Sequence, residues 1–360
     1  MAGQGDDRMN AESRITGRVE PVIQAADLKM HFQARLGIIR SLLGEVPSAI
    51  RALDGVDLSI HKSRIVGLVG ESGCGKSTLG MTLVRMYQPN AGQVLFEGRD
   101  ITHAHGSSLK NYQRQAQIIF QDPYSSLNPR LTIGQIVEEP LIIHRIGTAH
   151  ERLEKVRKAL HQVRMQPDEY LDRFPSDLSG GQRQRIAIAR ALVLEPKFIV
   201  ADEPVSMLDV SIQASVLELL NDLSRELGLA VLYISHDIAT VGYICDRIMV
   251  MYLGVVVEEG SIREVLGAPK HPYTRRLLAA IPEISPSGKR ERIELKGEVP
   301  SPLNVPPGCR FSSRCPFKTD LCENQAPMFA NVGGTHRVRC HAWPGATSHG
   351  GAGASRPVLS

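Results

Sequence analysis

Short apolar runs alternate with amphipathic segments along most of the chain, and this alternation predicts strands separated by helices. The runs typical of buried strands are "IVGLV" (65–69), "KFIVADEP" (197–204), "AVLYISHD" (230–237) and "RIMVMYLGVVVEEG" (247–260). Helical spacing of apolar residues follows in "STLGMTLVRM" (77–86) and "SIQASVLELLNDLSREL" (211–227). Strands alternating with helices predict an α/β fold with a mainly parallel sheet covered on both faces.

Two stretches depart from this alternation. Residues 131–177 contain charged helical sequence such as "ERLEKVRKALHQVRMQ" and no strand run, which predicts a helical subdomain at about 125–190 inserted into the sheet. Beyond residue 260 proline becomes frequent, as expected for a linker and a small irregular C-terminal region. We expect a disordered arm (1–20), a main domain (21–262), a C-terminal region (263–345) and a disordered tail (346–360).

Composition narrows the class of protein only slightly. The 360 residues include 42 basic and 38 acidic side chains, a mixed balance of +4 that argues against a chain coating nucleic acid. The first twenty residues are polar, and no uncharged apolar run approaches the roughly 18 residues that a membrane helix needs. We therefore expect a cytosolic chain that reaches a membrane only through a partner.

The apolar run 65–69 leads directly into "GESGCGKST", residues 70–78, a loop of the G-x-x-x-x-G-K-[ST] type. In such loops glycines let the backbone approach nucleotide phosphates, the lysine reaches the β- and γ-phosphates, and the hydroxyl binds Mg²⁺. The nucleotide-binding residues predicted here are Gly70, Ser72, Gly73, Cys74, Gly75, Lys76, Ser77 and Thr78. Cys74 is expected to be a small filler, although an oxidisable thiol at this place could gate nucleotide binding.

Polar residues follow three other apolar runs. Asp202 and Glu203 end "FIVADE", and neighbouring side chains on a strand point in opposite directions, so they should have different roles. Asp202 suits the Mg²⁺ side and Glu203 the base that orients the attacking water. Gln121 in "IIFQDP" and His236 in "LYISHD" should also lie at the carboxyl edge of the sheet, although each alone is more often a cap or loop residue.

A second glycine-rich turn, "SDLSGGQRQRIAIAR" (176–190), opens another predicted helix. A γ-phosphate held at Lys76 needs charge stabilisation on its outer side, where the chain's own loop does not reach. If two such chains pack head to tail, the helix that begins near Ser179 in one would direct its free N–H groups at the nucleotide of the other.

Together and in this order, these motifs resemble the ATP-binding-cassette (ABC) family over about residues 22–260. The resemblance implies a P-loop NTPase fold with a RecA-like core, an antiparallel β subdomain and an inserted helical subdomain. It assigns Gln121 to the Q-loop, His236 to the γ-phosphate switch, and the Mg²⁺ site to Ser77, Gln121 and Asp202. The signature and D-loop that act in trans are Leu178, Ser179, Gly180, Gly181, Gln182 and Asp209. Phe32 is the candidate adenine platform, with a core role equally open.

The stretches "QDPYSSLNPR", "DEPVSMLDVSIQ" and "HPYTRRLLAAIP", and an insertion ahead of "ALDGVDLSI", are similar to the ATPase subunits of oligopeptide and dipeptide importers. Within that family the chain resembles the F-type subunit that pairs with a D-type ATPase. The resemblance implies two membrane permeases, an extracytoplasmic binding protein, and a peripheral place on the cytoplasmic face of the membrane. Nickel, glutathione and sugar importers use similar ATPases, and soluble ABC ATPases that act on DNA or ribosomes are a further alternative.

Four of six cysteines lie near the C-terminus: Cys309, Cys315, Cys322 and Cys340. In a cytosolic protein this grouping favours a metal site over disulfides. The spacing lacks C-x₂-C knuckles, so four thiolates could bind a [4Fe–4S] cluster, which related importer ATPases carry, or Zn²⁺. His336 and His341 keep a mixed Cys/His site open, and free thiols remain an alternative.

Overall fold

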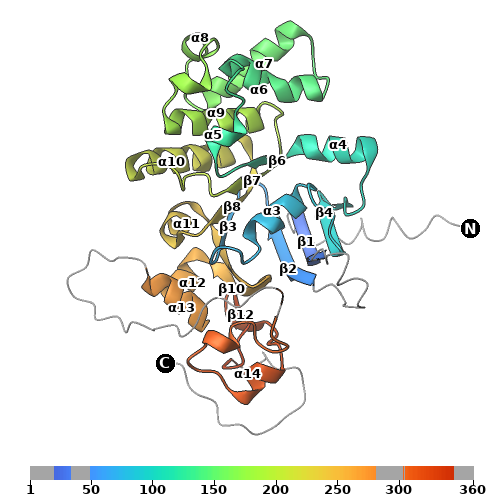
Figure 1. Ribbon diagram of the computed structural model, residues 1–360, viewed down its shortest axis with the longest axis vertical. Helices are drawn as coiled ribbons and strands as arrows, with labels where there is room; N and C mark the ends of the chain where they lie inside the picture. Colours follow the sequence, from blue (N-terminus) through green and yellow to red (C-terminus); the bar gives the residue numbers. More distant parts are fainter. Residues whose placement is uncertain (1–19, 34–48, 281–302, 304, 344–360) are drawn as a thin grey trace, which may run out of the picture.

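The computed structural model describes residues 20–33, 49–280, 303 and 305–343 (Figure 1). The expected N-terminal arm up to residue 19, the insertion at 34–48 and the expected C-terminal tail lie outside the described residues.

The strands form two sheets. The smaller sheet is antiparallel, with the order β2-β1-β4-β5, and contains β1 (Ile23–Gln33), β2 (Ala49–Ile60), β4 (Ala91–Phe96) and β5 (Arg99–Asp100). The larger sheet has the order β11-β12-β10-β9-β3-β8-β7-β6. Its parallel part contains β3 (Ile65–Val69), β6 (Ala116–Ile119), β7 (Phe198–Asp202), β8 (Ala230–Ser235) and β9 (Arg247–Tyr252). The expected α/β fold with a mainly parallel core sheet is confirmed.

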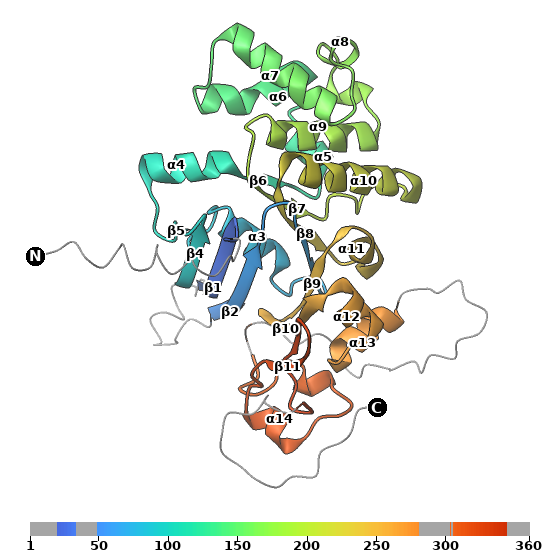
Figure 2. The same cartoon turned by 180° about the vertical axis from the view of Figure 1, so that it is seen from behind.

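Helices cover both faces of the large sheet. Helix α3 (Lys76–Leu83) contacts β7 and β8 on one side and β1 and β2 of the small sheet on the other. Its buried Leu79 and Leu83 join the apolar core shared by the two sheets. Helices on the opposite face include α10 (Val210–Leu227), α11 (Ile238–Ile244) and α12 (Ile262–Gly267). Figure 2 shows the small sheet and this second helical layer on opposite sides of the core strands.

A group of helices lies between β6 and β7 in the sequence and projects to one end of the molecule (Figure 1). It contains α5 (Pro123–Ser126), α6 (Ile133–Ile143), α7 (Ala149–Gln162), α8 (Pro167–Tyr170), the 3₁₀ turn Pro175–Asp177 and α9 (Gly180–Leu192). Capping boxes begin α6 at Thr132 and α7 at Thr148. A further helix, α4 (Gly106–Gln115), precedes β6.

The run 247–260 is two strands and not the single strand expected from its apolar residues. β9 ends at Tyr252 and β10 (Val255–Ser261) returns antiparallel to it. The two turn residues, Leu253 and Gly254, both have positive φ, at 43° and 80°. Positive φ at both positions is the requirement of a two-residue hairpin turn, and "LG" inside a long apolar run hides that signal.

The C-terminal region is more regular than expected. After α13 (Pro272–Ala279) come the 3₁₀ turn Ser312–Arg314, α14 (Asp320–Asn324), β11 (Ala330–Gly333) and β12 (His336–Val338). β12 pairs with β10 and β11 pairs with β12, so both strands extend the large sheet. At three and four residues these strands are too short to show a strand periodicity in the sequence.

Candidate functional site

The first glycine-rich loop lies between β3 and α3, where the apolar run predicted it. Gly75 has a φ of 109°, and a Cβ at this position would lie 2.2 Å from the carbonyl oxygen of Ala52. Both facts require glycine. Gly75 is also the N-cap of α3, so the free N–H groups of the first helical turn belong to the loop, as in a phosphate-binding site.

Lys76 is held inside this loop. Its side chain is buried, and Nζ donates to the carbonyl oxygens of Gly70 at 2.8 Å and Glu71 at 3.1 Å. A phosphate oxygen would offer the ammonium a charged acceptor, which makes a shorter and stronger hydrogen bond than a neutral carbonyl. The loop therefore holds its cation next to the space where phosphate would bind.

Two of the predicted side chains, Gln121 and His236, contact the carboxylate of a third, Glu203. Nε2 of Gln121 donates to Oε2 of Glu203 at 2.9 Å, and Nδ1 of His236 lies 3.0 Å from the same oxygen. They follow β6, β7 and β8, which are neighbours in the parallel part of the sheet. The carboxyl ends of parallel strands meet at one edge, so the topology joins positions 82 and 33 residues away from Glu203.

Glu203 itself has an unusual backbone. β7 ends at Asp202, and Glu203 has a φ of 47° while its N–H donates to the carbonyl of Ile234 at 2.9 Å. The left-handed conformation costs a residue with a Cβ on the order of 1–3 kcal/mol. The strand alternation expected to separate the two carboxylates does not extend to Glu203. This turn gives them different surroundings instead.

Asp202 has the properties of an acid that faces a cation. It is 6% exposed, and its Oδ1 has no hydrogen-bond partner within the described part of the chain. Burial raises the pKa of Asp202, while the Ser77 hydroxyl acts in the opposite direction. A buried carboxylate oxygen without a partner, next to a hydroxyl, fits the oxygen ligands that Mg²⁺ prefers. The predicted third ligand, Gln121, lines the neighbouring cavity but is bonded to Glu203.

One cavity of about 580 Å³ collects most of the predicted nucleotide site. The site residues predicted from the sequence that line this cavity are Phe32, Ser72, Gly73, Cys74, Gly75, Lys76, Ser77, Thr78, Gln121, Glu203 and His236. Gly70 and Asp202 are outside this lining. Phe32 is partly buried, and its ring meets Tyr87 edge-on at 5.4 Å between centroids, so it has a core contact as well as a face on the cavity. Burial raises the pKa of the Cys74 thiol, as expected for a filler.

The cavity also has a wall that the sequence did not predict: Ile50, Arg51, Ala52, Leu253 and Gly254. These residues come from β2 and from the β9–β10 turn. Nothing in the sequence around these residues sets them apart, and their place at the site follows from the packing of Gly75 against the carbonyl of Ala52.

The second glycine-rich turn has the predicted local structure. Ser179 caps α9: its hydroxyl accepts from the N–H of Gln182 at 3.3 Å, and its N–H donates to Oε1 of Gln182 at 2.9 Å. Gly181 packs so closely that a Cβ would lie 2.5 Å from Cγ2 of Ile212. Leu178 is buried, whereas Ser179 is exposed and Gly180 is partly exposed. Within the described residues, none of the five signature positions lines the cavity at Lys76.

Residues near the start of α10 are exposed. Asp209 is the N-cap of this helix, and Met207 and Val210 are 56% and 82% exposed.

The four C-terminal cysteines all lie within residues 305–343, but the structure does not support the predicted metal site. The N–H of Cys309 donates to the carbonyl of Cys322 at 2.7 Å. Burial raises the pKa of Cys309 to about 12 and that of Cys340 to about 11. Across the described ranges, no group of three or more His, Cys, Asp or Glu side chains is arranged to hold a metal ion. The [4Fe–4S] and Zn²⁺ alternatives lack geometric support for the same reason.

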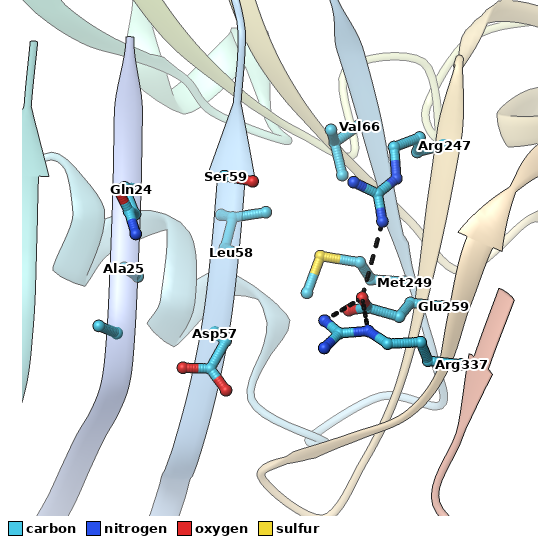
Figure 3. A pocket seen from close by; sticks show the side chains of 11 residues that line it. Gln24, Ala25, Asp57, Leu58, Ser59, Val66, Arg247, Met249, Glu259 and Arg337 are labelled. Atoms are coloured by element: carbon cyan, nitrogen blue, oxygen red, sulfur yellow. Dashed lines mark hydrogen bonds and ion pairs between the residues drawn. The ribbon is translucent and has the colours of Figure 1, made fainter. Parts of the chain in front are cut away.

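A second, smaller cavity of about 170 Å³ lies between the small sheet and strands β9, β10 and β12 (Figure 3). Oε1 of Glu259 accepts from Nε of Arg337 at 2.9 Å and lies 3.6 Å from Nη2 of Arg247. Val66 and Arg247 are paired at the starts of β3 and β9. This cavity is thus away from the phosphate loop, which follows the other end of β3.

Comparisons with known proteins agree with this geometry. Residues 53–206 match the family described as "ABC transporter", and residues 257–322 match "Oligopeptide/dipeptide transporter, C-terminal region". The oligopeptide transport ATP-binding protein AppF of Bacillus subtilis is 46% identical over 327 residues, which cover 90% of this chain and 98% of the relative. The dipeptide transport ATP-binding protein DppF of Escherichia coli is 45% identical over 323 residues, covering 90% and 95%.

Among solved structures, the ATP-binding cassette MJ0796 in its dimeric post-hydrolysis state with ADP and Pi has a TM-score of 0.57 and 29% identity, covering 67% of this chain and 99% of that one. Within the described residues, no helix has the length and apolar character needed to cross a membrane. The cavity, its motifs and the extent of the match lead to one conclusion. This chain belongs to the ABC transporter family, among the oligopeptide and dipeptide transport ATP-binding proteins.

Proposed function

We propose that this chain is the ATP-hydrolysing subunit that powers peptide import through a membrane ABC transporter. The observation that carries the ATPase proposal is the cluster of Gln121, Glu203 and His236, which faces the phosphate loop across one cavity. The peptide cargo is supported by the relatives, which are named for oligopeptide and dipeptide transport.

The roles of the site residues follow from their positions. The N–H groups of the loop and Nζ of Lys76 bind the phosphates, and the Phe32 ring stacks on the adenine. Oε2 of Glu203 orients and deprotonates the attacking water, while Gln121 and His236 fix this carboxylate by contacting the same oxygen. Asp202 and Ser77, with Gln121, would hold Mg²⁺, which neutralises charge on the β- and γ-phosphates when bound.

The outer side of the γ-phosphate requires a second subunit. The signature residues 178–182 do not line the chain's own cavity among the described positions, and Ser179 and Asp209 are exposed. We therefore infer a head-to-tail pair in which each subunit offers its signature to the other's ATP, with a D-type ATPase as the partner. The dimeric state named for MJ0796, a structural neighbour, supports such a pair.

The remaining parts of the importer would be two membrane permeases and an extracytoplasmic binding protein, which place this chain on the cytoplasmic face of the membrane. Cargo is selected by those proteins, so nickel, glutathione or sugar import would leave the chemistry of this chain unchanged. A soluble role on DNA or ribosomes would leave the C-terminal match to peptide transporters without a purpose.

We further propose that the chain divides into a nucleotide-binding domain (21–262) and a C-terminal region (263–345). The nucleotide-binding domain would include a helical part at about 125–190. A [4Fe–4S] cluster on Cys309, Cys315, Cys322 and Cys340 is a separate proposal, which rests on the sequence resemblance alone. No step of ATP hydrolysis depends on it. Iron and sulfide assays on anaerobically purified protein, with Cys315→Ser as the comparison, test this proposal directly.

The test of the assembly uses a tagged chain purified from native membranes in mild detergent, followed by mass spectrometry. We expect two multi-span permeases and a second cassette ATPase to co-purify. Recovery in the soluble fraction, with DNA or ribosomes and without a permease, would overturn the transport proposal.

A further inference from the structure

The C-terminal region is joined to the cassette by contacts on the large sheet. β12 pairs with β10 through Glu258↔Val338 and Glu259↔Arg337. Behind this pairing, Nε2 of His336 lies 2.7 Å from Oε1 of the fully buried Glu258. The Arg337–Glu259 ion pair, visible in Figure 3, adds a further contact between the same strands. Side chains of this region therefore have a fixed position relative to the cassette.

Two side chains from outside the matched cassette segment reach the phosphate loop, and both contact Glu71. The hydroxyl oxygen of Tyr273 accepts a hydrogen bond from the backbone N–H of Glu71 at 2.8 Å. The guanidinium of Arg314 pairs with the Glu71 carboxylate through Nη1–Oε2 at 2.7 Å and Nη2–Oε1 at 3.3 Å. This two-pronged geometry fixes orientation as well as charge.

Both contacts are held by packing. Tyr273 is fully buried, with its ring 4.8 Å from Tyr252 and 5.5 Å from Phe311 between centroids. The Arg314 side chain is 8% exposed and lies on the Tyr252 ring at 6.0 Å. The Glu71 side chain is 27% exposed, so the pair is partly shielded from water, and such a pair loses more when one partner is deleted than a fully exposed pair does. These residues are therefore rigid supports and not mobile surface groups.

Glu71 connects these supports to the catalytic lysine. Its carbonyl oxygen accepts a hydrogen bond from Nζ of Lys76 at 3.1 Å. Its N–H donates to the Tyr273 hydroxyl oxygen, and its carboxylate forms an ion pair with Arg314. Each of these three polar groups therefore has a hydrogen-bond or ion-pair partner, and two of the three partners lie beyond residue 257 in the sequence. A shift of Glu71 would move the loop backbone that precedes Lys76.

We propose that Tyr273 and Arg314 are positioning residues for ATP binding, which hold Glu71 and thereby set the phosphate loop. This inference concerns the ATP step alone and does not depend on peptide cargo. The C-terminal region is then a structural part of the nucleotide site, and its docking sets the affinity of the cassette for nucleotide.

The test compares purified full-length variants in fluorescent ATP-analogue titrations and steady-state hydrolysis. Tyr273→Phe removes a single hydroxyl, and we expect it and Arg314→Ala each to weaken binding by about three- to tenfold, as the loss of one buried or charged hydrogen bond would. KM should rise while kcat changes by less than about twofold, since Glu203 and its partners are untouched. Arg314→Lys should restore part of the affinity because it keeps the charge without the planar fork.

Two further variants separate positioning from general destabilisation. Lys318→Ala removes another ion pair of the C-terminal region, the exposed pair with Glu323, which touches neither the loop nor the β10–β12 pairing, and we expect wild-type ATP affinity from it. The double variant Glu71→Ala with Arg314→Ala should bind no more weakly than Glu71→Ala alone, because both changes remove one interaction. The proposal is overturned if Tyr273→Phe and Arg314→Ala bind ATP as the wild type does, or if Lys318→Ala weakens binding equally.

Discussion

Nδ1 of His236 lies 3.0 Å from Oε2 of Glu203, the same oxygen that accepts a hydrogen bond from Gln121. Two groups, from the ends of the strands on either side of β7, therefore fix one carboxylate oxygen. Among the described residues, Glu203 is the acidic side chain that lines the cavity, and these two contacts hold its carboxylate in place.

Glu203→Gln should stop hydrolysis while leaving ATP binding intact. The amide keeps the shape of the side chain but cannot accept the proton of the attacking water, and a lost general base costs about 10²- to 10⁴-fold in rate. Phosphate release and nucleotide titration measure the two effects. Glu218→Gln, on α10 beside Tyr243, is the matched control and should hydrolyse ATP normally. Normal turnover by the Glu203 variant would exclude it as the base.

Gly75→Ala should abolish ATP binding. The new methyl group would meet the Ala52 carbonyl at 2.2 Å in a backbone conformation with φ of 109°, so the loop must change shape. Gly106→Ala is the control, because Gly106 also has a positive φ of 55° but open space around the added Cβ. That control should lose about 1 kcal/mol of unfolding free energy and no affinity. Equal ATP affinity in both variants would contradict the loop assignment.

Ser179→Ala should affect the partner's ATP and not the chain's own. The change removes the hydroxyl of the α9 cap, which costs about 1 kcal/mol of stability, and removes a polar group from the surface offered in trans. In a pair whose own site carries Glu203→Gln, the remaining turnover belongs to the partner's site, and we expect Ser179→Ala to reduce it. Ser176→Ala, three residues upstream, should not. Unchanged turnover with Ser179→Ala would argue against the head-to-tail pair.

Stability should fall as the pH drops below about 6.5, because His271 is fully buried. Burial lowers the pKa of His271 to about 4, with Glu258 acting in the opposite direction. A lowered folded-state pKa means that the unfolded chain binds the proton first, so unfolding free energy decreases between pH 6.5 and 4 by about 1.4 kcal/mol per pH unit.

His271→Asn is the informative variant for this prediction. Asparagine can still accept from the Tyr273 N–H, as Nδ1 of His271 does at 3.1 Å, but it does not titrate. Denaturant melts from pH 4 to 7 should show a shallower loss of stability in this variant. Identical pH profiles would exclude His271 as the titrating group.

The local parts of the proposed site could be located from the sequence. The apolar run 65–69 followed by glycines located the phosphate loop, and polar residues after apolar runs located Gln121, Glu203 and His236. Both signals are local, since a buried parallel strand and its carboxyl-end residue are read within about ten residues.

The contacts between residues far apart in the chain could not be predicted from the sequence. Tyr273 and Arg314 reach Glu71 across 202 and 243 residues, and each stands in a stretch with ordinary helix or turn composition. Leu253 and Gly254 form a turn that only positive φ values reveal. The backbone of Glu203 likewise departs from its strand, and its N–H donates to the carbonyl of Ile234 in the adjacent strand.

The most direct test of the central claim is peptide uptake by proteoliposomes that contain this chain, its co-purified membrane partners and the binding protein. We predict ATP-dependent accumulation of labelled di- or oligopeptides with the wild-type chain and none with Glu203→Gln. ATP hydrolysis without peptide accumulation, or equal accumulation with Glu203→Gln, would contradict the account.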